Sequence, residues 1–163
     1  SEGQASKEQL EKLAQAVDQE YESCFAEKKS FFGTEQIEEA MQKVMDQYAG
    51  GIGTHYQFNE KQLAMAEEKI KKLQILAKGL AAADMHELMF IYELKERLTV
   101  CLTVIAHLRA RKETRWHSFA ENLDYPEKSD AWLCYVNSKK NGDQITMIRR
   151  DLVKGGETYE HRD

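Results

Sequence analysis

Two adjoining stretches set the architecture of this chain: residues 86–109 read HELMFIYELKERLTVCLTVIAHLR, and residues 110–139 read ARKETRWHSFAENLDYPEKSDAWLCYVNSK. Apolar residues in the first stretch recur every three or four positions, which predicts one long amphipathic helix. They are Leu88, Ile91, Leu94, Leu98, Cys101, Ile105 and Leu108. After Pro126, the only proline of the chain, apolar residues alternate instead, which is typical of a β-strand. The chain therefore changes from helix to strand across a charged loop.

Two helices are predicted near the N-terminus. The first should be capped by Ser6, with Gln9 as its capping-box partner, and should run to about Lys28. The second should be capped by Thr34 and stopped by the pair Gly50-Gly51. Their apolar stripes consist of Leu10, Leu13, Val17, Tyr21 and Cys24 in the first helix, and of Ile37, Met41, Val44 and Tyr48 in the second.

A third helix should begin after the N-cap Asn59, and the long helix should begin after the N-cap Asp84 and end near Lys112. Glu87 occupies the capping-box position of the long helix. The core face of the third helix is expected to contain Leu63, Ala66, Ile70, Leu73 and Ala77. The apolar face of the long helix widens to include Val100, Leu102 and Val104, which indicates packing on more than one side. Such a helix is either central in a bundle or lies at a domain interface, where a missing neighbour leaves an apolar patch exposed.

A small β-hairpin is predicted after the helices. Trp132, Cys134 and Val136 alternate on one side of a turn, Ile145 and Met147 alternate on the other, and Asn141-Gly142 supplies residues that accept a positive φ. We therefore expect a mainly α fold, a three- to four-helix bundle that resembles a spectrin repeat, followed by this C-terminal hairpin. The expected division is an N-terminal helix at 1–33, a helical bundle with an arginine-rich exit loop at 34–126, the hairpin at 127–153 and a tail at 154–163.

Composition excludes several classes of protein. The 163 residues suffice for one domain with a buried core, and 31% charged with 42% hydrophobic residues is ordinary for a globular protein. The net charge of −5 argues against a nucleic-acid partner, because such a surface needs clustered Lys and Arg. No apolar run approaches the roughly 20 residues of a membrane span. Three cysteines without a CxxC motif predict free thiols, and a cytoplasmic location fits them best.

No catalytic, cofactor-binding or metal-binding residue is predicted in this chain. His86-Glu87 lacks the second His of a zinc-protease motif, since position 90 is Phe, and no Glu-x-x-His pair suits a di-iron bundle. The glycines at 50, 51 and 53 follow a helical pattern rather than a strand, so they read as a helix stop and not as a dinucleotide-binding turn. Cys101 has apolar and threonine neighbours, which indicates an inert packed thiol.

The segment Arg111-Lys-Glu-Thr-Arg115 followed by Asp124-Tyr-Pro126 resembles the C-terminal helical domain of the succinate dehydrogenase/fumarate reductase flavoprotein family. In that family the helix typically ends in Arg-x-Glu-Ser-Arg, with Asp-Tyr-Pro a short way downstream. Two further stretches are similar: Met45-Asp-Gln-Tyr-Ala-Gly-Gly51 running into Asn59-Glu-Lys-Gln-Leu63, and Trp132 with the strand at 134–139. The likeness covers residues 37–153 and is strongest to adenylylsulfate reductase alpha subunits. It departs at Trp116-His117, where succinate and fumarate enzymes usually carry Gly-Ala-His.

This resemblance implies a parent enzyme larger than the chain. Such a parent would hold FAD in an upstream domain and pass electrons between FAD and an iron–sulfur partner subunit, acting on a small anionic substrate. Because the sequence opens at Ser1, we expect an excised, non-catalytic C-terminal domain that packs on the flavin domain and helps to position the iron–sulfur subunit. The alternative is a free-standing helical interaction module without a redox role.

Five residues of the charged loop are candidates for a domain interface: Arg111, Glu113, Arg115, His117 and Tyr125. The planar fork of arginine suits bidentate contact with carboxylates or phosphates. The cluster could be structural, could contact the flavin domain or partner subunit as the resemblance implies, or could contact substrate. We expect its partners to lie outside this chain, so that Arg115→Ala would perturb the isolated chain far less than a core mutation.

Overall fold

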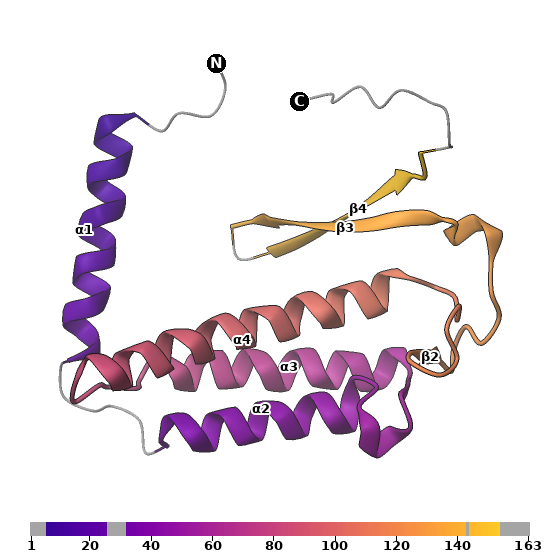
Figure 1. The fold of residues 1–163 in the computed structure, drawn as a ribbon, viewed down its shortest axis with the longest axis horizontal. Helices are drawn as coiled ribbons and strands as arrows, with labels where there is room; N and C mark the ends of the chain where they lie inside the picture. Colours follow the sequence, from indigo (N-terminus) through magenta and orange to yellow (C-terminus); the bar gives the residue numbers. More distant parts are fainter. Residues whose placement is uncertain (1–5, 26–31, 143, 154–163) are drawn as a thin grey trace.

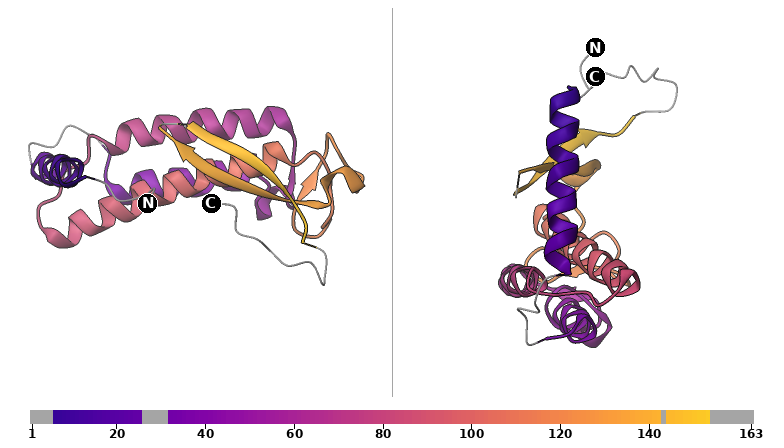
Figure 2. Two further views of the ribbon diagram at one scale, coloured as in Figure 1. Left: turned by 90° about the horizontal axis from the view of Figure 1, so that it is seen from above. Right: turned by 90° about the vertical axis from the view of Figure 1, so that its left-hand side faces the viewer.

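The computed structural model describes residues 6–25, 32–142 and 144–153. Its helices are α1 (Lys7–Cys24), α2 (Thr34–Tyr48), α3 (Glu60–Ala77) and α4 (Met85–Ala110). Helices α2, α3 and α4 lie side by side as a three-helix bundle, while α1 projects from one end of the bundle at a steep angle (Figures 1 and 2). The predicted mainly α fold with a bundle is confirmed. The first helix ends at Cys24, with Phe25 as its C-cap, before the predicted end at about Lys28. Position 28 and the predicted tail lie outside the described residues.

Local sequence signals position the helix starts. Ser6 forms the predicted capping box with Gln9, and Asn59 accepts a hydrogen bond from the Gln62 backbone N–H at 2.8 Å. The second helix begins one residue earlier than predicted, because its N-cap is Gly33 and not Thr34. The physical reason is Gln36, whose side chain accepts from the Gly33 N–H at 2.9 Å and so completes the cap one position upstream.

The N-cap of α4 is the predicted Asp84, which accepts from the Glu87 N–H at 2.9 Å. The Glu87 carboxylate reaches one residue further back and accepts from the Ala83 N–H at 2.7 Å. The helix ends at Ala110, two residues before the predicted end. The carboxylates of Asp84 and Glu87 thus cap the first turn of α4, and their negative charge also suits the positive end of the helix dipole.

The core lies between α2, α3 and α4 and consists of the predicted apolar stripes. Its fully buried side chains are Ile37, Leu63, Ile70, Leu88, Ile91, Leu94, Leu98 and Ile105. The stripe of α1 joins this core only at Cys24, the one buried residue of that helix. On α4, Leu102 packs against the core, whereas Val100 and Val104 remain 59% and 41% exposed. The widened face of α4 is thus divided, with Leu102 on the core side and Val100 and Val104 exposed.

Two glycines shape the end of α2. Gly50 has φ +75°, and a Cβ on Gly51 would clash with the Asp46 Cα. The predicted helix stop is therefore confirmed, because only glycine accepts both the positive φ and the close approach. A short 3₁₀ turn, η1 (Ile52–Thr54), follows. The chain then enters β1 (Gln57–Phe58), which pairs in parallel with β2 (Glu121–Asn122) and joins the α2–α3 connection to the exit loop.

The predicted hairpin consists of β3 (Cys134–Asn141) and β4 (Gln144–Asp151). Asn141 pairs with Gln144, so Asn141 still belongs to the strand. The assignment of Asn141 to the turn is wrong because strand pairing extends one residue further than the alternation suggested. Trp132 was also misassigned, since it lies in the 3₁₀ turn η2 (Asp130–Trp132) before β3. The hairpin lies over α4 (Figure 1). Within the described ranges, no helix is long and apolar enough to cross a membrane.

Candidate domain interface

A buried carboxylate, Glu113, lies at the centre of the exit loop that follows α4. Its side chain is 0% exposed and pairs with Arg111 (Nη1 to Oε1, 2.6 Å) and with Arg115 (Nε to Oε1, 2.9 Å). Arg115 Nη2 also donates to Oε2 at 3.0 Å, which makes its contact bidentate. The helix stops at Ala110, and the backbone is extended at Arg111. The side chains of Arg111 and Arg115 therefore meet at Glu113 from both sides of it in the sequence.

The same two arginines also bind backbone carbonyls of the segment that leads into the hairpin. Arg111 donates to the carbonyls of Trp132 and Cys134, each at 2.9 Å, and Arg115 donates to the Ser129 carbonyl at 3.2 Å. The Ser129 N–H in turn donates to Glu113 Oε2 at 3.0 Å. The network therefore fixes the end of α4, the turn η2 and the start of β3 to one another.

The electrostatics of Glu113 follow from these contacts. Burial on its own would raise the pKa of the Glu113 carboxyl. The hydrogen bonds from Arg115, from the Ser129 N–H and from Arg111 outweigh burial and hold that pKa below its ordinary value. Glu113 is thus held as a carboxylate, and its role here is to compensate two cations within the domain.

Trp132 is enclosed by two guanidinium groups. The Arg149 Cζ lies 4.3 Å from the centroid of the indole ring and the Arg111 Cζ lies 5.9 Å from it. Arg149 also donates to the carbonyl of Ala131. Through these cation–π contacts, Arg149 of β4 and Arg111 at the end of α4 both hold the Trp132 ring of η2. The hairpin is thereby fixed to the end of α4.

Thr114 organises the remainder of the loop from the side opposite Glu113. It is 1% exposed, its hydroxyl donates to the Tyr125 carbonyl at 2.8 Å, and the same oxygen accepts from the Asn122 N–H at 2.9 Å. Asp124 extends the loop's contacts to the bundle by accepting from the Glu60 N–H, at the N-terminus of α3, at 2.7 Å. Sequence reasoning missed Thr114, although its alternation with Glu113 was a usable signal.

His117 and Tyr125 stand apart from this network. The His117 side chain is 62% exposed, and its Nδ1 lies 3.5 Å from Glu121 Oε1. Tyr125 is 42% exposed, and the Lys112 Nζ lies 5.8 Å from its ring centroid. The structure therefore brings together Arg111, Glu113 and Arg115 and leaves the other two candidates outside the group.

The expectation that the arginines' partners lie outside the chain is wrong. Glu113 and three backbone carbonyls, all in this chain, accept from Arg111 and Arg115. The expectation treated the cluster as a set of exposed pairs, whereas its acceptor is a fully buried carboxylate. A structural role within the domain is accordingly supported by direct contacts.

Next to the network, residues 116–120 form a tight loop that we call the aromatic loop. Trp116 and Phe119 on this loop are 69% and 74% exposed. The loop is closed by an isolated bridge between Trp116 and Ala120, and the Trp116 carbonyl accepts from the N–H groups of Phe119 and Ala120, both at 3.0 Å. Exposed aromatic side chains on a fixed backbone are typical of protein interaction surfaces, because little entropy is lost when they bind.

Chemistry at other positions is limited in the part of the chain that the structure describes. No group of three or more His, Cys, Asp or Glu side chains there could hold a metal ion. Burial raises the pKa of the Cys101 thiol, which favours an unreactive, protonated sulfur.

A family model described as "Fumarate reductase flavoprotein C-term" matches residues 38–157. The chain belongs to this family. Among curated proteins, the adenylylsulfate reductase subunit alpha of Megalodesulfovibrio gigas is 34% identical over 98 residues, which are 60% of this chain and 15% of that protein. The alignment to the family agrees with the resemblance that the exit loop carried.

Solved structures extend the likeness to nearly the whole chain. Adenylylsulfate reductase from Archaeoglobus fulgidus matches with a TM-score of 0.79 and 31% identity, covering 96% of this chain and 26% of that one. An E. coli quinol fumarate reductase matches with a TM-score of 0.75 and 19% identity over 97% of this chain and 27% of its own, which shows a shared fold. This chain thus spans about a quarter of the length of these structures.

Proposed function

We propose that the chain is the non-catalytic C-terminal helical domain of an FAD-dependent oxidoreductase of the fumarate reductase, succinate dehydrogenase and adenylylsulfate reductase type. The match of residues 38–157 to the family model carries the proposal, together with the 26% coverage of the Archaeoglobus fulgidus structure. In this proposal, FAD binds to a domain that precedes the helical one in a longer chain, and electrons pass between FAD and an iron–sulfur subunit in the cytoplasm.

The proposed substrate of the parent enzyme is adenylylsulfate. The Megalodesulfovibrio gigas and Archaeoglobus fulgidus proteins, at 34% and 31% identity, are adenylylsulfate reductases, whereas the quinol fumarate reductase stands at 19%. The residues at Trp116-His117 also differ from the Gly-Ala-His usual in succinate and fumarate enzymes. Substrate contact would come from the preceding domains.

A structural role for the exit loop supports the non-catalytic part of the proposal. Arg111 and Arg115, the cations best suited to an anionic substrate, already bind Glu113 and backbone carbonyls. Through these contacts the bundle at 34–126 and the hairpin at 127–153 act as one unit. The surfaces proposed to meet the flavin domain and the iron–sulfur subunit are the aromatic loop and the exposed Val100 and Val104 of α4.

Expression of the complete reading frame tests this function. The full-length protein should reduce adenylylsulfate together with its iron–sulfur subunit, and Arg115→Lys should leave the KM for adenylylsulfate unchanged. A changed KM for adenylylsulfate in the Arg115→Lys variant would instead place Arg115 at the substrate. A start codon directly before Ser1, with no flavin-binding sequence upstream, would favour the free-standing interaction module.

A further inference from the structure

Helix α1 touches the bundle only through its last turns. Cys24 is buried, and its carbonyl accepts from the Ala82 N–H at 2.7 Å. The Tyr21 ring lies 5.4 Å from the Tyr92 ring of α4, and Glu20 pairs with Lys95 at 2.9 Å. These contacts anchor the C-terminal end of α1, and the rest of the helix stands away from the bundle (Figure 2).

The projecting part of α1 carries an apolar surface that we call the α1 stripe: Leu10, Leu13 and Val17. These side chains are 55%, 62% and 39% exposed. Their spacing of three and four residues puts them on one helix face, and continuing the same spacing leads to Tyr21 and Cys24, which contact the bundle. The α1 stripe thus continues the helix face that contacts the bundle at Tyr21 and Cys24.

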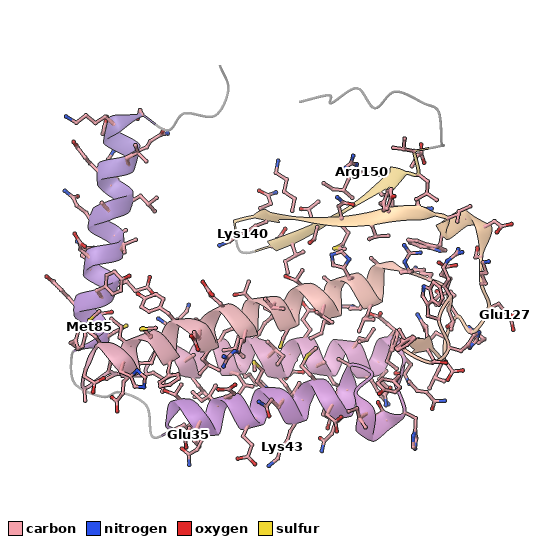
Figure 3. The ribbon with its side chains drawn as sticks, viewed as in Figure 1. Glu35, Lys43, Met85, Glu127, Lys140 and Arg150 are labelled. Carbon is pink, nitrogen blue, oxygen red and sulfur yellow. The ribbon has the colours of Figure 1, made fainter. Side chains whose placement is uncertain are left out.

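A hollow of about 250 Å³ lies at the anchored end of α1, between Tyr21 and the first half of α4. Met85 and Met89, which line it, are 64% and 60% exposed, and Figure 3 shows Met85 at this corner. Tyr92 also lines the hollow. Flexible methionine side chains suit an apolar occupant.

Helix α1 is regular along its whole length. It has 18 residues and a complete capping box at Ser6. Isolated helices of this length are marginal in water, and most helices in proteins are held by packing of an apolar face. A capped helix with an apolar stripe beyond its anchor therefore fits a second packing partner.

The comparisons identify the kind of partner. The Archaeoglobus fulgidus structure is matched by 96% of this chain, so only about seven of 163 residues fall outside, fewer than the 18 of α1. Most of α1 is therefore shared with a chain in which three quarters of the length lies elsewhere. The family model is a C-terminal one that matches from residue 38 onward, so we infer that the additional length precedes α1.

We propose that the α1 stripe and the hollow at its base bind the domain that directly precedes α1 in the same polypeptide. This inference rests on the proposed function. The surface fits an apolar patch with a basic rim, since α1 carries five carboxylates and two lysines. α1 then acts as a bracket that holds the helical domain to the flavin domain.

The test compares Leu13→Glu with Gln15→Glu in the full-length flavoprotein. Position 15 is two residues after position 13, so the two side chains lie on nearly opposite faces of α1. Both are exposed in this chain. Hydrogen exchange of α1 is measured by mass spectrometry in the full-length protein and in the 163-residue chain. The full-length protein should protect α1 relative to the isolated chain, and Leu13→Glu should remove at least about tenfold of that protection, the factor expected from losing one buried leucine. Gln15→Glu should retain it.

Two results would overturn the inference. Equal protection in the two full-length variants would show that the α1 stripe is not bound. A 163-residue chain that is dimeric by light scattering and becomes monomeric on Leu13→Glu would show that a second copy occupies the stripe. Either result leaves the proposed function standing if the full-length protein contains flavin, whereas a flavin-free protein would remove the proposed function itself.

Discussion

Replacing Glu113 with glutamine should strongly destabilise the isolated chain. The two carboxylate oxygens accept four hydrogen bonds, from Arg111, twice from Arg115 and from the Ser129 N–H. Glutamine keeps one acceptor oxygen and turns an NH₂ group toward two of these donors. At about 1.5–3 kcal/mol for each bond to a charged group, two lost bonds correspond to about 3–6 kcal/mol. The arginines are 32% and 20% exposed and regain some hydration, so we expect about 3 kcal/mol.

The assay is urea unfolding of the 163-residue chain followed by circular dichroism, with free energies from linear extrapolation. Glu39→Gln is the matched control, because Glu39 pairs with Lys43 on the exposed face of α2 and its loss should change little. A Glu113→Gln variant within about 1 kcal/mol of the parent would refute the reasoning, since losing two bonds to a charged group exceeds that value. The network would then contribute to geometry rather than to stability.

The same residue gives a pH dependence with a definite sign. The folded-state pKa of Glu113 is lowered, so its contribution to stability is present above the unfolded pKa of about 4.3. That contribution is lost as pH falls from this value through the folded pKa. The difference in unfolding free energy between the parent and Glu113→Gln should therefore be constant near neutrality and shrink in acid.

Three further outcomes are expected. Ile105→Asp should cost several kcal/mol in urea unfolding, because position 105 is 1% exposed and the new charge would have no partner; unchanged stability would mean that this face of α4 is not core. Trp132→Ala should loosen the hairpin and speed hydrogen exchange in β3 while leaving α2 and α3 protected. Equal acceleration of exchange in β3, α2 and α3 would contradict the role of the Trp132–Arg149 contact in fixing the hairpin. Trp116→Ala should leave the melting temperature of the isolated chain unchanged, because the side chain is 69% exposed. In the full-length enzyme it should weaken binding of the iron–sulfur subunit or docking of the helical domain on the flavin domain.

Much of the bundle could be predicted from local patterns. The stripe of α3 and the caps Ser6, Asn59 and Asp84 depend on residues three or four apart, and these relations exist within each helix. The cap of α2 and the hairpin turn were each displaced by one residue. In both places a neighbouring interaction, the Gln36 side chain or the Asn141–Gln144 pair, moved the boundary without changing the element.

Long-range placement was beyond the sequence patterns. The stripe of α1 predicted that the helix needs a partner, but periodicity does not say which surface supplies it, and the structure shows α1 anchored only near Tyr21 and Cys24. In the candidate site, three of the five candidates, Arg111, Glu113 and Arg115, contact one another, whereas His117 and Tyr125 lie outside that group. Their acceptors at Ser129 and Trp132 depend on how the loop folds back, which spacing along the chain does not encode.

The most direct test of the proposed function is the visible absorption spectrum of the full-length gene product beside that of the isolated 163-residue chain. We predict a flavin spectrum for the full-length protein. The isolated chain should be colourless and should give no calorimetric signal with FAD or AMP. A colourless full-length protein, or stoichiometric binding of FAD by the isolated chain, would contradict the assignment of this chain as a non-catalytic domain of a flavin-dependent oxidoreductase.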